Sequence, residues 1–297
     1  FLKIEDGCDI FCSYCIIPYV RGKVTSKKID DILFEAEQLV SNGYKEIVLT
    51  GIHLGAYGKE TGYQLNIINV LEELQALPGL ERIRLSSIEV NEVTDDLIDL
   101  IADSDRVCPH FHLPLQSGDD YILKRMNRKY DAAQYLETVE RIRGRLELPS
   151  ISTDILVGFP GEKRIHFENT MKLCEQAGFS RAHIFSYSPR EDTPAAKMPD
   201  HCKPSDIKER KKELEFLTAE TSLEYKNLFV GRDIGILVEK ERDKKTGKLC
   251  GYSDRYIKAL FDGPDDLMNE IADVHVESVS PQSVMGKCCS HAERGNK

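Results

Sequence analysis

Short apolar runs and helix-like stretches alternate along the first part of the chain. Six runs rich in apolar and β-branched residues predict strands, at 1–4, 46–51, 82–87, 110–115, 151–159 and 181–187. Five stretches between them repeat apolar residues at helical spacing, at 30–43, 65–77, 94–103, 130–144 and 164–178, and several end at a glycine. This alternation favours a parallel sheet and predicts an α/β fold, a partial (β/α)6 barrel.

The pattern changes after residue 188. Residues 189–204 contain four prolines and no periodicity, which predicts a linker. The next stretch opens with Ser205 as an N-cap and continues as one long charged helix. From Gly231, strand-like pieces and turns predict a small β-barrel of about five strands, and four strand-like pieces stand out, at 233–241, 249–253, 256–261 and 271–280. The expected domains are therefore 1–188, 189–230 as linker and helix, and 231–297 with a polar tail.

The composition is that of a globular cytoplasmic protein. With 41% hydrophobic and 30% charged residues, wholesale disorder is excluded. No apolar run reaches the roughly 18 residues that span a bilayer, so we expect no membrane partner. Nine cysteines, three of them crowded near the start, do not resemble a disulfide framework and favour a reducing compartment. The net charge of −10 argues mildly against a nucleic-acid partner, unless local basic patches supply the contacts.

The sequence GCDIFCSYC places Cys8, Cys12 and Cys15 directly after the first predicted strand. Three thiolates can bind three irons of a [4Fe-4S] cluster, which leaves the fourth iron open to a chelating ligand. The amino and carboxylate groups of S-adenosylmethionine (SAM) form such a chelate. A zinc site or inert thiols are the alternatives, but the nearest histidine, His53, lies 38 residues beyond Cys15. At these cysteines the sequence resembles the radical SAM superfamily.

Further segments resemble the signatures of one family within that superfamily, the methylthiotransferases. They are CIIPYVRG (15–22), EIVLTGIHLGAYG (46–58), RLSSIE (84–89), HLPLQSGDDYILKRMNRKY (112–130), TDILVGFPGE (153–162) and FSYSPREDTPAAKM (185–198). The C-terminal module is similar to a TRAM domain, so the resemblance covers essentially the whole chain. The segment 49–58 most resembles the MtaB-type branch, which converts N6-threonylcarbamoyladenosine at tRNA position 37 to its 2-methylthio derivative. The branches acting on isopentenyladenosine and on a ribosomal-protein aspartate are the alternatives.

The resemblance implies the cofactors, the partners and the chemistry. A reduced cluster would transfer one electron to SAM and release a radical that attacks an unactivated carbon, and a second SAM would donate the methyl group. The implied partners are tRNA and an electron donor such as flavodoxin or ferredoxin. Family members also carry an N-terminal domain with a second [4Fe-4S] cluster, and only seven residues precede Cys8. The resemblance therefore predicts that sulfur insertion needs residues outside this sequence. Asp192 stands where the family usually has glycine.

The resemblance also implies a SAM site near the ends of the strands, where barrels of this kind bind ligands. The implied SAM-binding residues are Tyr14, Thr50, Gly51, Ser87, Glu89, Gln116, Asp154 and Gly158. Asp154 is a polar residue within an apolar strand, which predicts that it faces the site. Gly158 predicts a close approach of the backbone to adenine. The alternative for the polar members of this set is helix capping at the strand ends.

The C-terminal module combines basic and aromatic residues. Residues 231–297 hold 11 Lys and Arg against 12 Asp and Glu, whereas the preceding part carries most of the negative charge. Cations and aromatic faces suit single-stranded anticodon bases, so we expect RNA contacts from Lys240, Arg242, Lys244, Lys245, Tyr252, Arg255, Tyr256 and Lys258. Arg125, Arg128 and Lys129 are candidates for a further phosphate contact. The alternative for these residues is a solvated hairpin with tyrosines in the barrel core. For the whole protein, the non-enzyme alternative is an RNA-binding protein with a vestigial cluster.

Overall fold

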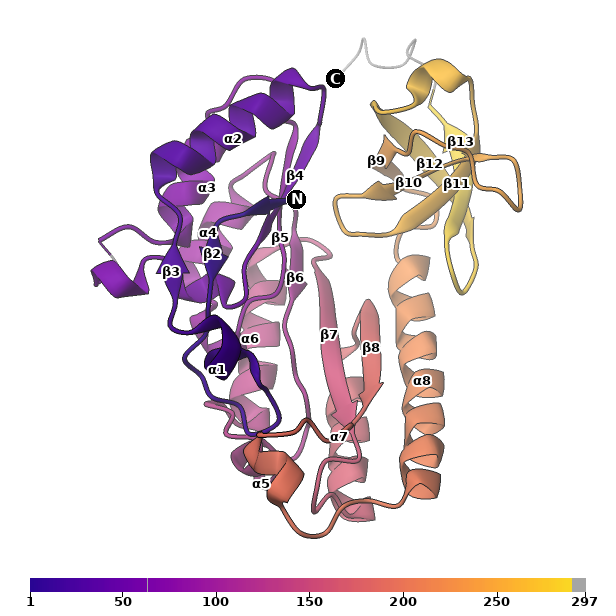
Figure 1. Cartoon of the computed structure of the whole chain (residues 1–297). Helices are drawn as coiled ribbons and strands as arrows, with labels where there is room; N and C mark the ends of the chain where they lie inside the picture. Colours follow the sequence, from indigo (N-terminus) through magenta and orange to yellow (C-terminus); the bar gives the residue numbers. More distant parts are fainter. Residues whose placement is uncertain (63, 290–297) are drawn as a thin grey trace.

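A computed structural model describes residues 1–62 and 64–289 of the chain. Six parallel strands form its curved inner wall (Figure 1): β1 (Leu2–Lys3), β4 (Glu46–Thr50), β5 (Arg82–Leu85), β6 (His110–His112), β7 (Ser150–Val157) and β8 (Arg181–Ser186). Two three-stranded sheets, β1-β4-β5 and β6-β7-β8, meet at isolated bridges that join Ile83 to Val107 and Ser87 to His112. A separate pair, β2 (Glu5–Asp6) and β3 (Thr25–Ser26), is antiparallel. The expected partial barrel is confirmed.

In the part of the chain that the structure describes, six helices follow the predicted periodicity and cover the outer face of this wall. They are α2 (Ile29–Ser41), α3 (Ile67–Gln75), α4 (Asp95–Ala102), α6 (Ala132–Arg145), α7 (Arg164–Ala177) and α8 (Pro204–Asn227). The sequence pattern did not predict two short helices, α1 (Ile17–Arg21) and α5 (Asp120–Arg125). Short 3₁₀ turns lie at Leu54–Ala56, Lys59–Thr61, Val90–Glu92, Pro194–Lys197 and Asp265–Leu267. Asn66 and Asp131 begin α3 and α6 with capping boxes, and Gly178 ends α7 in the left-handed conformation. Gly144 is not a helix end, because α6 continues to Arg145.

The long helix begins two residues earlier than the N-cap Ser205 predicts. Lys203 occupies the cap position, and Pro204 is the first helical residue. Proline suits that position because its fixed φ is helical and its missing N–H has no partner there anyway. Helix α8 then runs beside β8 towards the C-terminal β-barrel (Figure 1), where Tyr225 donates a hydrogen bond to the Leu148 carbonyl at 2.9 Å.

The C-terminal β-barrel is closed, in the order β10-β11-β13-β12-β9. Its strands are β9 (Asp233–Val238), β10 (Leu249–Ser253), β11 (Lys258–Asp262), β12 (Ile271–Val279) and β13 (Val284–Cys288). Buried Ile236, Phe261 and Val274 fill its interior. The small β-barrel is confirmed, but the sequence pattern did not locate β13, because Gly286 and Lys287 interrupt its short apolar run. The part of the predicted polar tail from residue 290 onward lies outside the described residues.

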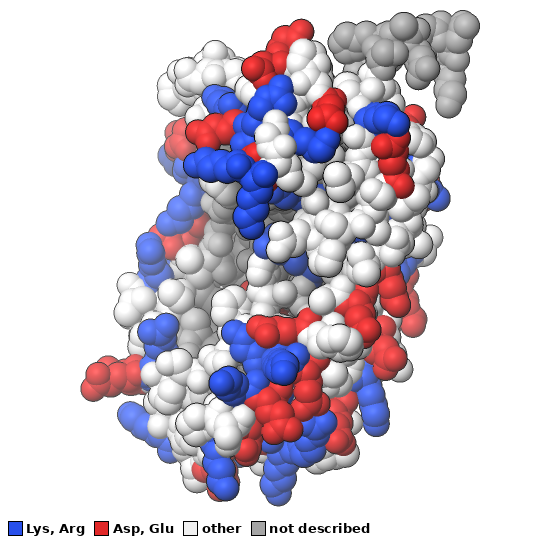
Figure 2. All heavy atoms as spheres, turned by 90° about the vertical axis from the view of Figure 1, so that its right-hand side faces the viewer, with Lys and Arg blue, Asp and Glu red and all other residues white. Residues whose placement is uncertain are grey.

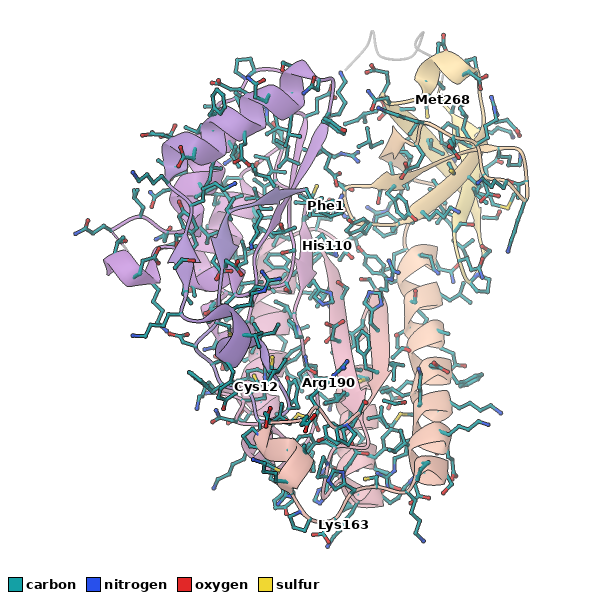
Figure 3. The ribbon with its side chains drawn as sticks, viewed as in Figure 1. Phe1, Cys12, His110, Lys163, Arg190 and Met268 are labelled. Atoms are coloured by element: carbon teal, nitrogen blue, oxygen red, sulfur yellow. The ribbon has the colours of Figure 1, made fainter. Side chains whose placement is uncertain are left out.

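The β-barrel packs against the amino ends of the parallel strands. Arg82, the first residue of β5, donates to the carbonyl oxygens of Gly235 and Tyr252 at 2.7 and 3.1 Å. The cysteine loop follows β1 and β2 and therefore lies at the opposite, carboxyl end of the wall. Figure 3 shows Cys12 farther from the β-barrel than His110 is. Within the described parts of the chain, no helix combines the length and the apolar character needed to cross a bilayer.

Candidate active site and substrate cavity

The three cysteines lie on one loop between β2 and α1 whose backbone is fixed by hydrogen bonds. The Cys8 amide donates to the Gly22 carbonyl at 3.0 Å, and the Cys15 amide donates to the Cys12 carbonyl at 3.0 Å. The end of α5 holds the middle of the loop, because Asn127 donates to the Phe11 carbonyl at 2.8 Å. All three thiols are free. The fold therefore presents them from a rigid loop at the carboxyl ends of the strands.

The environment of these thiols suits several thiolate ligands held together. Burial raises the pKa of the Cys15 thiol, and the nearby Cys12 and Cys8 raise it further, which shows that the three groups interact. Arg128 donates to Cys12 Sγ at 3.3 Å and supplies a buried positive charge. Among the described residues, no three His, Cys, Asp or Glu side chains are arranged to hold a single metal ion. In a [4Fe-4S] cluster the cysteines bind different irons, so three free cysteines presented by one loop fit it.

Arg128 is not the surface phosphate contact that the sequence suggested. Its side chain is buried, where it forms an ion pair with Glu89 and donates to the Tyr130 hydroxyl at 3.1 Å. Burial raises the pKa of Glu89 although the charge of Arg128 lowers it. Tyr14 lies beside the same group, and burial raises the pKa of its hydroxyl. The structure thus brings Tyr14 and Glu89, two of the predicted SAM-binding residues, together beside Cys12.

Two further predicted residues, Thr50 and Gly51, end β4 beside a buried carboxylate that sequence reasoning missed. Glu5 is 1% exposed, and its Oε2 accepts the His53 amide at 2.7 Å. A Cβ at Gly51 would lie 2.5 Å from Glu5 Oε2, so a larger residue there would force the Glu5 side chain to move. Oε1 of Glu5 is buried and has no protein partner. The hydrogen-bonding capacity left at Oε1 is typical of a ligand site.

His53 was considered only as a zinc ligand, and it takes part in a different network. Its Nε2 lies 2.5 Å from Glu92 Oε1. Burial lowers the pKa of His53, but the nearby Cys8 and the Glu92 carboxylate outweigh burial and raise it to about 10. The signal for this network was present in the sequence only as isolated polar residues, because Cys8, His53 and Glu92 come from three separate loops.

The remaining predicted SAM-binding residues lie in different surroundings. Gln116 follows β6 with a positive φ of 63°, and its backbone pairs with Ile155. Ser87 and Asp154 face a cavity inside the barrel. Gly158 has a φ of +83°, but a Cβ there would lie 2.4 Å from Cγ1 of Ile207 in α8. The close approach at Gly158 is therefore to α8, and its contact with SAM stays a prediction.

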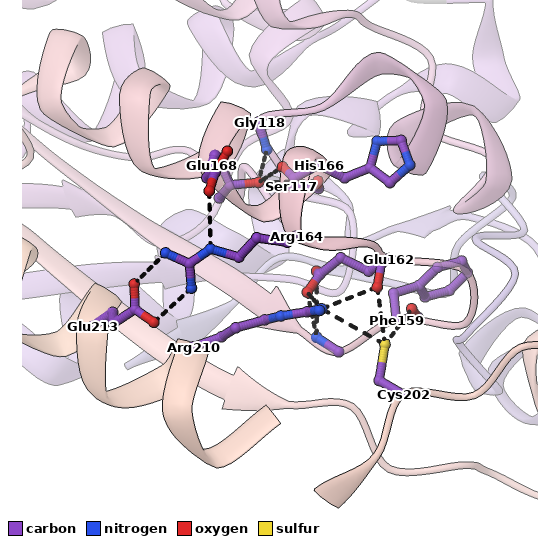
Figure 4. A network of polar contacts seen from close by, with 12 residues as sticks. Ser117, Gly118, Phe159, Glu162, Arg164, His166, Glu168, Cys202, Arg210 and Glu213 are labelled. Atoms are coloured by element: carbon purple, nitrogen blue, oxygen red, sulfur yellow. Dashed lines mark hydrogen bonds and ion pairs between the residues drawn. The ribbon is translucent and has the colours of Figure 1, made fainter. Parts of the chain in front are cut away.

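A buried ion pair fixes the loop after β7 to α8 (Figure 4). Arg210 of α8 donates to Glu162 Oε1 at 2.6 Å and to the Glu162 carbonyl at 3.0 Å. Burial raises the pKa of Glu162 while Arg210 lowers it. Cys202 donates to the Phe159 carbonyl at 3.5 Å in the same network. Nearby, Asp192 adopts a φ of 68°, the left-handed conformation that glycine usually takes, so aspartate tolerates the turn.

A cavity of about 570 Å³ lies between the barrel wall and the C-terminal β-barrel. Its volume is within the range of small-molecule sites. Strands β5 to β8 supply its inner wall, with His110, His112, Asp154, Arg181 and His183 among the lining residues. His112 Nε2 lies 3.3 Å from Asp154 Oδ2, and Ser152 Oγ contacts both His112 and His110. The barrel interior is therefore polar on the side that faces the β-barrel.

The predicted RNA-binding residues divide into two groups. Tyr252, Arg255, Tyr256 and Lys258 line the mouth of the cavity. The predicted hairpin 239–248 joins β9 to β10 and carries the other four. On it, Arg242 is paired with Asp265 at 2.6 Å and Lys240 lies 5.6 Å from the Tyr44 ring centroid, whereas Lys244 and Lys245 are exposed. Figure 2 shows basic side chains gathered on the upper part of one face, where the β-barrel lies.

Comparison with known proteins identifies the class to which this fold and cysteine loop belong. Residues 2–174 match the Radical SAM superfamily, and the chain belongs to it. The superfamily implies a [4Fe-4S] cluster and SAM as cofactors. Two solved structures share the fold. The radical SAM methyltransferase TsrM from Kitasatospora setae superposes with a TM-score of 0.55 and 16% identity. The match covers 66% of this chain and 38% of the TsrM chain. Coproporphyrinogen III oxidase from Escherichia coli has a TM-score of 0.53, 15% identity and coverage of 74% and 51%.

The resemblance to methylthiotransferases is confirmed by curated relatives. The threonylcarbamoyladenosine tRNA methylthiotransferase MtaB of Thermotoga maritima is 40% identical over 286 residues, which are 96% of this chain and 64% of that protein. The MtaB protein of Bacillus subtilis is 37% identical, with coverage of 93% and 61%. The tRNA-2-methylthio-N(6)-dimethylallyladenosine synthase of Alkaliphilus oremlandii is also 37% identical, with coverage of 97% and 61%. The chain spans less than two thirds of the length of these relatives.

Proposed function

We propose that this chain is the radical SAM and RNA-binding part of a tRNA methylthiotransferase that modifies C2 of N6-threonylcarbamoyladenosine at position 37. The observation that carries the proposal is the arrangement along the barrel. A three-thiol loop lies at the carboxyl ends of the strands, and a polar cavity opens at the amino ends towards a β-barrel that presents aromatic and basic side chains. A nucleoside entering that cavity from an RNA would have its base directed towards the thiol loop.

Cys8, Cys12 and Cys15 would hold the [4Fe-4S] cluster, and Arg128 would offset part of the negative charge of the thiolates. Tyr14, Thr50, Gly51, Ser87, Glu89, Gln116, Asp154 and Gly158 are the residues proposed to contact SAM. When bound, the cluster and SAM supply the one-electron chemistry that breaks a C–H bond. The rigid cysteine loop orients this chemistry, and the Arg128–Glu89 pair holds the neighbouring wall in place.

The β-barrel residues are proposed to bind the anticodon loop. Tyr252 offers a ring face to the cavity, whereas Arg84 covers one face of the Tyr256 ring, and Arg255 and Lys258 lie beside the two tyrosines. An enzyme that acts on a base must take it out of the stack, and aromatic side chains stabilise the extruded base. The exposed lysines of the hairpin 239–248 would contact phosphates further along the RNA. An RNA partner implies a cytoplasmic location, and the proposed electron donor is a flavodoxin or a ferredoxin.

The choice of substrate branch rests on sequence similarity alone. The MtaB protein of Thermotoga maritima is 40% identical to this chain, and the dimethylallyladenosine synthase of Alkaliphilus oremlandii is 37% identical. Isopentenyladenosine in tRNA is therefore the second candidate substrate. Mass spectrometry of tRNA nucleosides from a deletion strain distinguishes the two. Loss of the methylthiolated threonylcarbamoyl nucleoside is expected, whereas loss of the isopentenyl form would contradict the proposed branch.

The radical SAM activity of the chain itself is tested by SAM cleavage. After anaerobic reconstitution, the protein should form 5′-deoxyadenosine when dithionite is added, and the Cys12→Ala variant should not. Cys250→Ala is the matched control, because Cys250 is a buried cysteine of the β-barrel far from the loop. Equal product from the parent and Cys12→Ala would refute the enzyme and favour an RNA-binding protein with a vestigial cluster.

A further inference from the structure

The cavity between the two barrels differs in charge from the rest of the protein. The chain has a net charge of −10. The cavity lining nevertheless contains four cationic side chains, Arg181, Lys226, Arg255 and Lys258, and Asp154 as its carboxylate. A concave surface of positive charge within an acidic protein attracts an anionic group and concentrates it at the site.

Three of these four cations already have protein partners. Arg255 pairs with Asp254 at 2.7 Å and donates to the Leu148 carbonyl at 2.9 Å. Lys258 pairs with Asp243 at 3.1 Å. Lys226 donates to the Pro281 carbonyl, and burial lowers its pKa.

Arg181 differs from the other three. Within residues 1–62 and 64–289, its guanidinium makes no hydrogen bond or ion pair with another side chain or carbonyl, although it lines the cavity at the start of β8. In the parallel pairing of β7 with β8, Arg181 lies opposite Ser152. The positive charge of Arg181 is therefore available to a bound anion.

Two residues that line the same cavity as Arg181 carry hydrogen-bonding atoms without partners. His110 is 5% exposed, and its Nδ1 is buried without a partner in the protein. The hydroxyl of Ser86, which also lines the cavity, lacks a partner too. Buried polar atoms are normally satisfied, so two orphaned atoms facing one cavity indicate a polar ligand. Burial lowers the pKa of both His110 and His183, which keeps these rings neutral and able to donate and accept.

Part of the lining is unsuited to an apolar group. Polar side chains gather there, among them Ser87, His112, Ser152, Asp154 and His183, while Val48 and Leu85 supply apolar surface elsewhere in the cavity. An isopentenyl group placed there would desolvate these polar groups and return no hydrogen bonds. A threonylcarbamoyl group carries a hydroxyl, a urea and a carboxylate, which match such a wall.

We propose that Arg181 is the residue that selects the substrate, by binding the carboxylate of the N6-threonylcarbamoyl group inside the cavity. This inference rests on the proposed function, since it assumes that an adenosine enters from the RNA side. The planar guanidinium binds a carboxylate through two parallel hydrogen bonds, which a lysine cannot reproduce. An RNA phosphate offers similar anionic oxygens, and the experiment separates these two sources.

The test compares three anticodon stem-loop RNAs that differ only at position 37, which carries threonylcarbamoyladenosine, isopentenyladenosine or unmodified adenosine. The parent protein should bind the threonylcarbamoyl RNA most tightly. Arg181→Gln should lower the affinity for the threonylcarbamoyl RNA by about 10- to 100-fold, the range for a hydrogen bond to a charged group. The affinities for the other two RNAs should stay unchanged. Arg181→Lys should recover part of the loss. Because Arg181 has no structural partner, both variants should melt at the parent temperature.

Lys245→Gln serves as the matched control, because Lys245 is an exposed hairpin residue that is expected to contact phosphate. Its replacement should lower the affinity for all three RNAs alike. If Arg181→Gln also lowers the affinity for all three RNAs equally, Arg181 binds phosphate and the inference is overturned. Unchanged binding of the threonylcarbamoyl RNA overturns it as well. A parent protein that prefers the isopentenyl RNA would instead refute the proposed function, and the two failures are distinguishable.

Discussion

The guanidinium carbon of Arg84 lies 4.0 Å from the centroid of the Tyr256 ring. Arg84 belongs to barrel strand β5, whereas Tyr256 belongs to the C-terminal β-barrel, and this contact joins the two parts. Arg84 also donates to the Asp254 and Ser253 carbonyls at 2.6 and 3.1 Å, and it pairs with Glu46 at 2.9 Å. One buried cation therefore sets the position of the predicted RNA-binding residues relative to the barrel.

Replacing Arg84 by methionine should destabilise the protein strongly. The variant leaves the partly buried Glu46 carboxylate and two interdomain carbonyls without their main partner. Removing one member of a buried ion pair costs about 3–5 kcal/mol in the free energy of unfolding, which urea denaturation measures. Glu46→Gln combined with Arg84→Met should recover part of this loss. Lys211→Gln, which removes an exposed helical ion pair, should leave the unfolding midpoint in place. An Arg84→Met midpoint equal to that of the parent contradicts the interpretation.

Substituting Gly51 by alanine should destabilise the cysteine end of the barrel. The new Cβ would overlap Glu5 Oε2, a buried atom that accepts the His53 amide. Overpacking of this kind costs about 1–3 kcal/mol, measurable by urea denaturation.

Gly144→Ala is the matched control for Gly51→Ala. Nothing lies within 4 Å of a Cβ at Gly144, which is a helical residue of α6. That change should stabilise the protein by about 0.5–1 kcal/mol. Equal stabilities of the two variants would mean that Glu5 moves away from Gly51 without cost.

The stability of the protein should fall in mildly acidic solution because of His110. Burial, aided by the positive charge of Arg84, lowers the pKa of His110 well below 6.5. The unfolded chain then binds a proton near pH 6.5 that the folded protein does not bind. The free energy of unfolding therefore decreases as the pH falls below about 6.5, by up to about 1.4 kcal/mol per pH unit from this group. Above that pH, the stability that neutral His110 contributes is fully present.

Urea denaturation of the parent and of His110→Gln between pH 5.5 and 7.5 measures this contribution. The variant should have a shallower dependence on pH, with its difference from the parent greatest at the acid end. Parallel curves for the two proteins would show that His110 becomes protonated in the folded state without penalty.

The Tyr252 ring should contribute to RNA binding. It is half-buried, lines the cavity mouth and lies 5.7 Å from the Tyr256 ring in an edge-to-face arrangement. Tyr252→Ala should weaken stem-loop binding by about 1–3 kcal/mol, the range for one stacked base. Tyr252→Phe keeps the ring face and should bind as the parent does, with fluorescence anisotropy as the measurement. If Tyr252→Phe is as weak as Tyr252→Ala, the hydroxyl and not stacking is responsible.

Local sequence patterns were sufficient for much of this protein. The strands, the main helices and the three-cysteine loop follow from periodicity and spacing over a few residues, because the side chains involved are neighbours along the chain. Strand β13 was missed, since the adjacent Gly286 and Lys287 leave its five residues without a clear apolar face. The start of α8 was misplaced by two residues, because Ser205 is a good N-cap residue but Lys203 occupies the cap position, before Pro204.

What the sequence by itself determined is the order of elements, the partial barrel and the thiol loop. Only the tertiary structure decided that Arg128 is buried beside Cys12 and that Gly158 packs against Ile207. It also decided that Arg181 and His110 meet the tyrosines of the β-barrel around one cavity. These contacts join residues far apart in the chain. Periodicity shows which face of an element is buried, whereas the partner of that face depends on how all the elements pack together.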